Sequence, residues 1–472
     1  MNRKEAKEQE IKFLAGESKK NPDFFKRETY LDDAQFLEKI GIFLPDKIQK
    51  NIFPGYLKLW PQDFIVEEVS KDGSFQTVGG DNSYKAEDNE KQSTIYATLV
   101  KCGLSTIEAI EEIASFLNTD KKNIQFAGIK DKDALTAQLI SFRGIDRAAI
   151  EKIYSPYFFL KDIHYGKGVM QVGGLAGNQF TIFIRTDESF EKENFLETLE
   201  LIKKNGFFNF FYSQRFSNPR FINWFWGLLI LKGEYKNAVF SLLCSEGQRE
   251  VPYFKKLRQD LKTNFGNWQA VGNILESLPL SFQNEIKMVD YLKKNPTDFA
   301  GALNQVPEQV QLWIYAYGSL LFNRKISEHL REEKPLPEKL PLILSQDKND
   351  WVQYNDFLIE DGITTIPFEE LRPFRFIQFK KRAVKTKEMV DIHNVAFIKE
   401  GVALSFTLGK GCYATTFLSH LFQLIGGLPP STISDIKVDS KALLGEGNVQ
   451  DILEKFKEVI SSKKEDLYSK FV

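Results

Sequence analysis

Apolar and polar residues alternate along several stretches of the chain, which is the pattern of strands with one buried face. Four stretches show it: Asp63–Val69, Thr94–Val100, Asn178–Arg185 and Val402–Leu408. In the third, Phe180, Ile182 and Ile184 fall on one face. The short apolar run Ile124–Ala127 predicts a further strand.

Apolar residues recur at helical spacing in other parts of the chain. Ser105 and Glu108 form a capping box, in which each side chain pairs with the backbone N–H of the other residue, and Asn118 closes the helix that follows. Helical patterns dominate residues 235–370: Val251–Phe265, Asn284–Lys294 and Gln309–Leu330. The apolar run Phe221–Leu231 is shorter than the roughly 18 residues of a membrane span, so a buried helix is expected there.

Strands with interleaved helices predict an α+β fold on a mixed or antiparallel sheet. Because the helix-rich stretch lies between strands, it is expected to be an insertion. The predicted parts are a charged N-terminal lead-in (1–50), the first part of a sheet domain (51–234), a helix-rich insertion domain (235–374), the second part of the sheet domain (375–440) and a C-terminal helical tail (441–472).

The composition is ordinary for a soluble globular protein, and 472 residues suggest two or three domains. The 63 Lys and Arg residues and 64 Asp and Glu residues give a formal net charge of −1, which argues against nucleic-acid binding through bulk charge. A local basic groove is compatible with it. Three separated cysteines support neither a zinc site nor a disulfide framework, and they favour a reducing cytoplasm. The four histidines are scattered and predict no metal cluster.

The stretch Phe126–Gln138 carries the strongest candidate chemistry. It places Asp131 between Lys130 and Lys132, just after an apolar run. Nearby positive charge favours the ionised form of a carboxyl group, and a carboxylate held ionised in a pocket can act as a nucleophile. The alternative for an isolated loop aspartate is a turn or helix cap, with its side chain bonded to the backbone.

This stretch resembles the catalytic signature of the TruD-type tRNA pseudouridine synthases, G-x-K-D-x-x-A-x-T-x-Q, at Gly128, Lys130, Asp131, Ala134, Thr136 and Gln138. Five other blocks resemble further motifs of the family and follow in the family's order: Lys58–Glu67, Gly174–Phe180, Asn209–Phe216, Gln311–Asn323 and Leu408–Thr415. One block alone is weak evidence, but the joint order along most of the chain makes the resemblance specific.

Three positions depart from the family pattern. Gln62 replaces the usual glutamate, and Tyr212 and Ser217 stand where the family usually has glycines. Because glycine permits a positive φ or a close backbone approach, these two replacements predict a shifted loop or a different RNA contact.

The resemblance implies a pseudouridine-synthase-type catalytic domain that converts a specific uridine of tRNA, uridine 13 in the D arm, to pseudouridine. It implies neither a cofactor nor a metal. Asp131 is the implied catalytic carboxylate, which either attacks the ribose or the base, or assists cleavage of the glycosidic bond. The implied partner is tRNA with a flipped-out uridine, without a membrane or an obligate protein partner.

The resemblance also implies a set of substrate-binding residues: Lys58, Phe211, Asn209, Lys130, Gln214 and Arg215. Lys58 would orient Asp131 and keep it ionised, and Phe211 would stack on the target base. Asn209 is either a turn residue or a support for the Asp131 loop. Gln214 and Arg215 are either a structural polar pair or phosphate contacts.

Three other functions are weighed against this one. A non-catalytic RNA-binding or RNA-chaperone protein on the same fold would not need Asp131, Lys58 and Phe211 together. A hydrolase that depends on carboxylates and Mg²⁺ would need clustered acids, which the chain lacks. A phosphatase of the haloacid-dehalogenase type is disfavoured because Leu135 stands where its D-x-D-x-T/V signature has Thr or Val.

Overall fold

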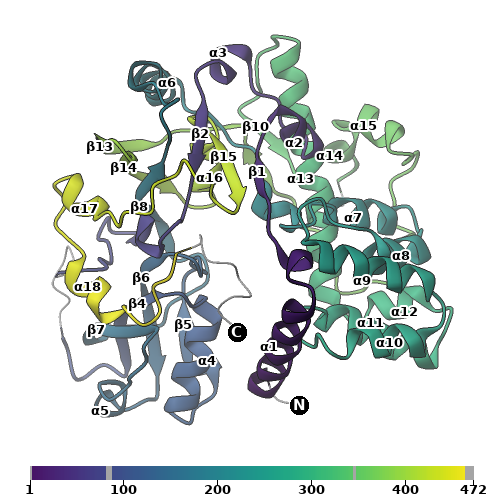
Figure 1. Ribbon diagram of the computed structural model, residues 1–472, viewed down its shortest axis with the longest axis horizontal. Coiled ribbons are helices and arrows are strands. Elements are labelled where there is room, and N and C mark those ends of the chain that lie inside the picture. The colour runs from purple at the N-terminus through teal and green to yellow at the C-terminus, as the bar shows by residue number, and fades with distance from the viewer. Residues whose placement is uncertain (1–2, 81–87, 344–346, 463–472) are drawn as a thin grey trace. The chain divides into compact units, whose positions relative to one another are not determined.

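The computed structural model describes residues 3–80, 88–343 and 347–462, and the chain forms two units (Figure 1). The sheet unit comprises Lys50–Phe207 and the described residues from Glu388 onward. The helical unit comprises Phe208–Lys387 and the described residues up to Gln49. Residues 208–234 and 375–387 therefore group with the helices, although the sequence placed them with the strands.

The sheet unit is built on a mixed sheet with the strand order β15-β2-β8-β3-β6-β4-β7. In addition, β14 pairs with β8, β13 with β14 and β5 with β6. The β15–β2 and β3–β6 pairs are parallel and the others are antiparallel. The strands are β2 (Phe53–Tyr56), β3 (Phe64–Ser70), β4 (Thr94–Cys102), β5 (Ile124–Phe126), β6 (Leu135–Arg143), β7 (Phe158–Gly166), β8 (Leu175–Arg185), β13 (Asp391–Ile398), β14 (Gly401–Gly409) and β15 (Phe422–Gly427).

Both faces of this sheet are covered. Helix α4 (Thr106–Phe116), with the predicted capping box present, packs its apolar side against β4 and β6 (Figure 1). On the opposite face, Ile452 and Phe456 of the C-terminal segment pack against Ile65 and Val100. The described part of the predicted tail is therefore packed onto the sheet, while residues 463–472 lie outside the described residues. The remaining helices are η2 (Pro61–Asp63), η3 (Lys121–Asn123), α5 (Arg147–Ile150), α6 (Lys192–Asn205), α16 (Ala414–Leu418), α17 (Ser440–Leu443) and α18 (Gln450–Lys455).

The stretch that carries Asp131 and the Leu408–Thr415 block belong to this one unit, although the helix-rich stretch separates them in sequence. The pairing of β8 with β14 explains why the Gly174–Phe180 block has a glycine at Gly177. A Cβ atom on Gly177 would lie 2.2 Å from the carbonyl oxygen of Leu408, so only glycine lets the two strands pair here.

The helical unit confirms the helices predicted between residues 251 and 330. Helix α7 is buried along most of its length and packs on α13, where Trp226 and Trp313 meet edge to face with ring centres 5.1 Å apart. No helix among the described residues is long and apolar enough to cross a membrane. The helices are η4 (Ser213–Phe216), α7 (Asn223–Leu231), α8 (Tyr235–Cys244), α9 (Pro252–Thr263), α10 (Trp268–Leu275), α11 (Gln283–Lys294), α12 (Phe299–Leu303), α13 (Pro307–Arg331), α14 (Lys348–Val352) and α15 (Asn355–Glu360).

The N-terminal segment belongs to the helical unit instead of forming a separate lead-in. Phe25, Phe36 and Ile40 are buried, and Asp33 caps α2 by accepting from the N–H of Phe36. Its elements are α1 (Arg3–Lys20), η1 (Pro22–Phe25), β1 (Thr29–Leu31), α2 (Ala34–Lys39) and α3 (Asp46–Gln49). Four short strands complete the chain: β9 (Phe207–Phe208), β10 (Lys339–Pro341), β11 (Ala383–Lys385) and β12 (Lys387–Glu388).

Candidate active site

Asp131 lies in the loop between β5 and β6, with its side chain 42% exposed. The polar residues of the motif hold this loop. Gln138 on β6 donates its amide to the carbonyl of Gly128 at 3.0 Å and accepts from the hydroxyl of Thr106 at 2.8 Å. The start of the loop is therefore fixed to β6 and α4, while the carboxylate of Asp131 remains accessible.

The carboxylate of Asp131 is paired with Lys58. The Nζ of Lys58 donates to Oδ2 of Asp131 at 2.7 Å and lies 4.0 Å from the centre of the Phe64 ring. The Lys58 side chain is only 15% exposed, and its backbone has a φ of +60°, uncommon for a residue other than glycine. The predicted pairing of Lys58 with Asp131 is thus present in the structure.

The turn that carries Lys58 is held by a buried ion pair. Asp63 accepts from the N–H of Trp60 at 3.0 Å and binds Arg185 on β8 through two hydrogen bonds of 2.8 Å each. Arg185 also donates to the carbonyls of Ser434 and Ile436 at 2.9 Å. Such a two-pronged pair fixes geometry as well as charge, so the Lys58 turn is tied to the centre of the sheet.

Lys130 is buried, and its ammonium is held by neighbouring strands. It lies 2.8 Å from Oε2 of Glu68 on β3 and donates to Oδ1 of Asn178 on β8 at 2.7 Å. This arrangement favours support of the loop over the substrate contact predicted from the sequence. Lys132 lies 3.6 Å from Glu108, so both lysines beside Asp131 pair with other carboxylates.

Sequence reasoning missed Lys101, a fully buried lysine on β4. Its Nζ donates to the backbone carbonyl of Asp131 at 2.6 Å. Burial lowers the pKa of Lys101 to about 8, against the opposing effect of Asp131. A charged residue inside an otherwise uncharged strand was the available signal. Glu68, Asn178 and Phe64 were also missed, because their positions depend on strand register.

The other predicted residues lie in the helical unit. The side-chain amide of Asn209 donates to the carbonyl of Lys385 at 3.1 Å. Phe211 is 7% exposed and packs edge-on against Phe322, with ring centres 5.3 Å apart. Asn323 of α13 binds the backbone of Phe211 twice, accepting from its N–H at 2.9 Å and donating to its carbonyl at 2.7 Å.

Gln214 and Arg215 follow Phe211 in the same segment. The guanidinium carbon of Arg215 lies 5.1 Å from the centre of the Phe211 ring, and Gln214 is exposed. The structure thus groups Asp131, Lys58 and Lys130 in the sheet unit, and Asn209 with Phe211, Gln214 and Arg215 in the helical unit.

The two glycine replacements have different consequences. Ser217 has a φ of +58°, so it takes the left-handed backbone that the family's glycine would favour. Tyr212 has an ordinary extended backbone, and its hydroxyl donates to Asp32, which pairs with Arg249 at 2.6 Å. The tyrosine therefore ties this segment to the N-terminal residues, a contact that glycine cannot make.

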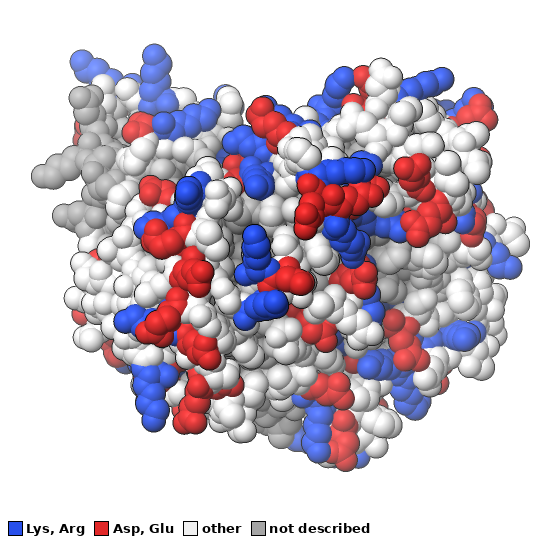
Figure 2. All heavy atoms as spheres, turned by 90° about the horizontal axis from the view of Figure 1, so that it is seen from above, with Lys and Arg blue, Asp and Glu red and all other residues white. Residues whose placement is uncertain are grey.

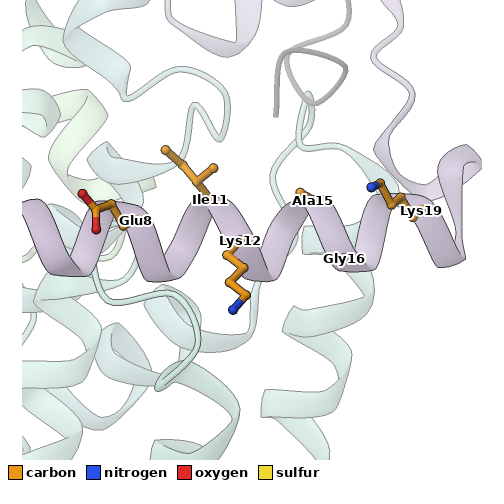
Figure 3. Close-up of a pocket in the computed structure, with 6 residues that line it drawn as sticks. All are labelled: Glu8, Ile11, Lys12, Ala15, Gly16 and Lys19. Atoms are coloured by element: carbon orange, nitrogen blue, oxygen red, sulfur yellow. The ribbon is translucent and has the colours of Figure 1, made fainter. Parts of the chain in front are cut away.

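Figure 2 shows Lys and Arg interspersed with Asp and Glu over the face that it displays, in keeping with the near-zero net charge. No group of three or more His, Cys, Asp or Glu that could hold a metal is found in the described part of the chain. A hollow runs along α1 and contains none of the predicted site residues (Figure 3); it is lined by Glu8, Ile11, Lys12, Ala15, Gly16 and Lys19.

Comparison with known proteins gives one consistent family. The profile of the family "tRNA pseudouridine synthase D (TruD)" matches residues 48–356. A Methanococcus aeolicus protein named "Probable tRNA pseudouridine synthase D" is 31% identical over 393 residues, 79% of this chain and 96% of the relative. A Thermoplasma volcanium protein of the same name is 28% identical over 437 residues, 81% of this chain and 97% of the relative.

A crystal structure supports the fold. A Methanosarcina mazei chain named for the same family superimposes with a TM-score of 0.62 and 22% identity, over 81% of this chain and 97% of that chain. The α+β fold with a mixed sheet and a helical insertion, expected from the sequence, is therefore confirmed.

Proposed function

The chain belongs to the tRNA pseudouridine synthase D (TruD) family and is a pseudouridine synthase, an isomerase; on that premise we propose that it converts uridine 13 of tRNA to pseudouridine with the carboxylate of Asp131. The observation that carries this proposal is the pair of Asp131 and Lys58, an accessible carboxylate held 2.7 Å from a mostly buried ammonium. Only an ionised carboxylate can act as the nucleophile, and Lys58 favours that form.

The reaction exchanges one bond of the nucleoside for another. The bond between C1′ of the ribose and N1 of uracil breaks, and C1′ then bonds to C5 of the rotated base. C5 loses its proton and the freed N1 gains one. Atoms balance without a co-reactant. The anion of Asp131 assists by attack on the ribose or the base, or by stabilising charge while the glycosidic bond breaks. In each route the carboxylate must face a uridine removed from its stack.

Flipping a base out of its stack costs a few kcal/mol, and contacts with the protein must offset that cost. We propose that Phe211 contributes by contact with the base, and that Arg215 and the exposed Gln214 approach the RNA backbone. The binding of Asn323 to both backbone groups of Phe211 supports this, because it orders the segment before RNA arrives. We place the enzyme in the cytoplasm with tRNA as its partner and no obligate protein partner.

The test is incubation of purified protein with unmodified tRNA in chelator-treated buffer. Pseudouridine is then mapped by chemical labelling and primer extension, with a tRNA in which position 13 is cytidine as the control. We expect conversion at position 13 alone. Binding of tRNA without conversion would favour the non-catalytic RNA-binding function instead, and conversion at another uridine would correct the proposed target.

A further inference from the structure

Lys101 is an unusual residue in the core of the sheet unit. It lies on β4, directly opposite Thr136 on β6, and its side chain is fully buried. Thr136 belongs to the motif that also contains Asp131, so β4 and the motif meet across one strand pair. Burial of an ammonium group is costly unless hydrogen bonds and charges compensate for the lost water.

The partners of this ammonium are backbone carbonyls of the Asp131 loop. Its Nζ donates to the carbonyl of Asp131 at 2.6 Å and lies 3.5 Å from the carbonyl of Lys130. An ammonium group has three hydrogens to donate, and two carbonyls that converge on it fix the course of the backbone. The loop is fixed again where Thr106 accepts from the N–H of Lys130 at 2.9 Å.

We propose that Lys101 is a positioning residue for the reaction, whose ammonium holds the backbone of Asp131 so that the carboxylate meets Lys58 and the flipped uridine. The inference rests on the proposed function of Asp131. Lys101 acts through the backbone of the loop, whereas Lys58 binds the carboxylate itself. The two lysines therefore hold opposite ends of one aspartate.

Burial of the Lys101 ammonium lowers its pKa and so makes this positioning sensitive to pH. The charged and titratable groups around Lys101 are Asp131 and Lys130 in the loop, Glu108 on α4 and Cys102 on its own strand. Burial lowers the pKa of Lys101 to about 8, and burial raises the pKa of Cys102 to about 12. Lys101 thus carries its charge below about pH 8 and loses it as the pH rises, while the Cys102 thiol stays protonated.

The experiment compares wild type with Lys101→Met and Lys101→Arg in kcat, KM for tRNA and the pH dependence of kcat. Methionine keeps an unbranched apolar stem and removes the ammonium, so kcat should fall by about 10- to 100-fold, since small misplacements of reacting groups cost this much. KM should stay within about twofold because phosphate contacts determine tRNA affinity. Arginine restores a permanent donor, so its kcat should recover at least in part.

The pH profiles test the role of the charge. Wild-type kcat should fall as the pH rises through about 8, and the Lys101→Arg variant should lose this step because arginine stays charged. Ionisation of uracil affects both proteins equally, so the difference between the profiles belongs to Lys101. If Lys101→Met does not fold, the comparison of the wild-type and Lys101→Arg pH profiles tests the inference by itself.

An unchanged kcat in folded Lys101→Met, or superimposable profiles for wild type and Lys101→Arg, would overturn the inference. The same measurements test the proposed function and the positioning role separately. Failure of the wild type to form pseudouridine refutes the proposed function, whereas normal wild-type turnover with an insensitive Lys101 refutes only the positioning role.

Discussion

Replacement of Lys58 by methionine separates the contribution of its ion pair to kcat from its contribution to the free energy of unfolding. The substitution removes the ammonium 2.7 Å from Asp131 and leaves an apolar chain against the Phe64 ring, which the ammonium approaches to 4.0 Å. Packing is therefore largely kept. Because Lys58 binds the carboxylate of Asp131 and not a backbone carbonyl of the loop, the backbone of Asp131 should keep its course.

The expected losses of unfolding free energy and of kcat follow from the exposure of the Lys58–Asp131 pair to water. Asp131 is 42% exposed, so water screens the pair in the free enzyme, and the free energy of unfolding should fall by no more than about 1 kcal/mol. When the flipped uridine fills the site and excludes water, the pair has the strength of a hydrogen bond to a charged group, about 1.5–3 kcal/mol. Loss of that energy in the transition state lowers kcat by about 10- to 150-fold.

Single-turnover pseudouridine formation measures the rate of the chemical step, and thermal unfolding measures stability. Filter binding measures the affinity for tRNA. The matched control is Lys132→Met in the same loop, since Lys132 reaches Glu108 at 3.6 Å and should be dispensable. A Lys58→Met enzyme with a kcat equal to that of wild type would refute the reasoning. So would equal losses of kcat in the two variants, because the effect would then come from loop charge in general.

Two further predictions concern the helical unit. Phe211→Ala should lower turnover and weaken tRNA binding together, by about 5- to 150-fold, the range expected for loss of base stacking worth 1–3 kcal/mol; an unchanged Kd for tRNA would contradict base contact by this ring. Gly227→Ala should lower the melting temperature, because its Cβ would lie 2.2 Å from the carbonyl oxygen of Trp313 and force α7 away from α13, at a cost of about 1–3 kcal/mol. Gly16→Ala is the control for helix propensity, since no described atom beyond its chain neighbours and the adjoining backbone of α1 lies within 4 Å of its added Cβ. Equal melting temperatures for these two variants would show that close packing is not limiting.

The sequence was most informative where one local pattern decides the structure. Alternation placed β3, β4, β8 and β14, and the Ser105 capping box placed the start of α4. The motif order led to the Asp131 loop and to Lys58, and the structure contains the predicted contact between these two side chains. The catalytic role of Asp131 stays a prediction.

What the sequence did not reveal depends on register and long-range contacts. Lys101 reaches Asp131 because β4 pairs with β6 in one register, which no local pattern specifies. The segment with Phe211 was placed with the strands, but Asn323 of α13 binds its backbone and holds it in the helical unit. The N-terminal residues were predicted to be a separate charged lead-in, although buried side chains such as Phe36 and Ile40 anchor them.

The most direct test of the central claim is tritium release from tRNA that contains 5-tritiated uridine, with wild type, Asp131→Asn and Asp133→Asn compared at equal tRNA occupancy. Asparagine keeps the size of the side chain and removes the anion. Asp133 lies in the same loop and provides the matched loss of one negative charge. We expect release from wild type and Asp133→Asn, and none above background from Asp131→Asn, with similar tRNA affinity for all three. Near-normal release by a folded Asp131→Asn protein would contradict the assignment of Asp131 as the catalytic carboxylate.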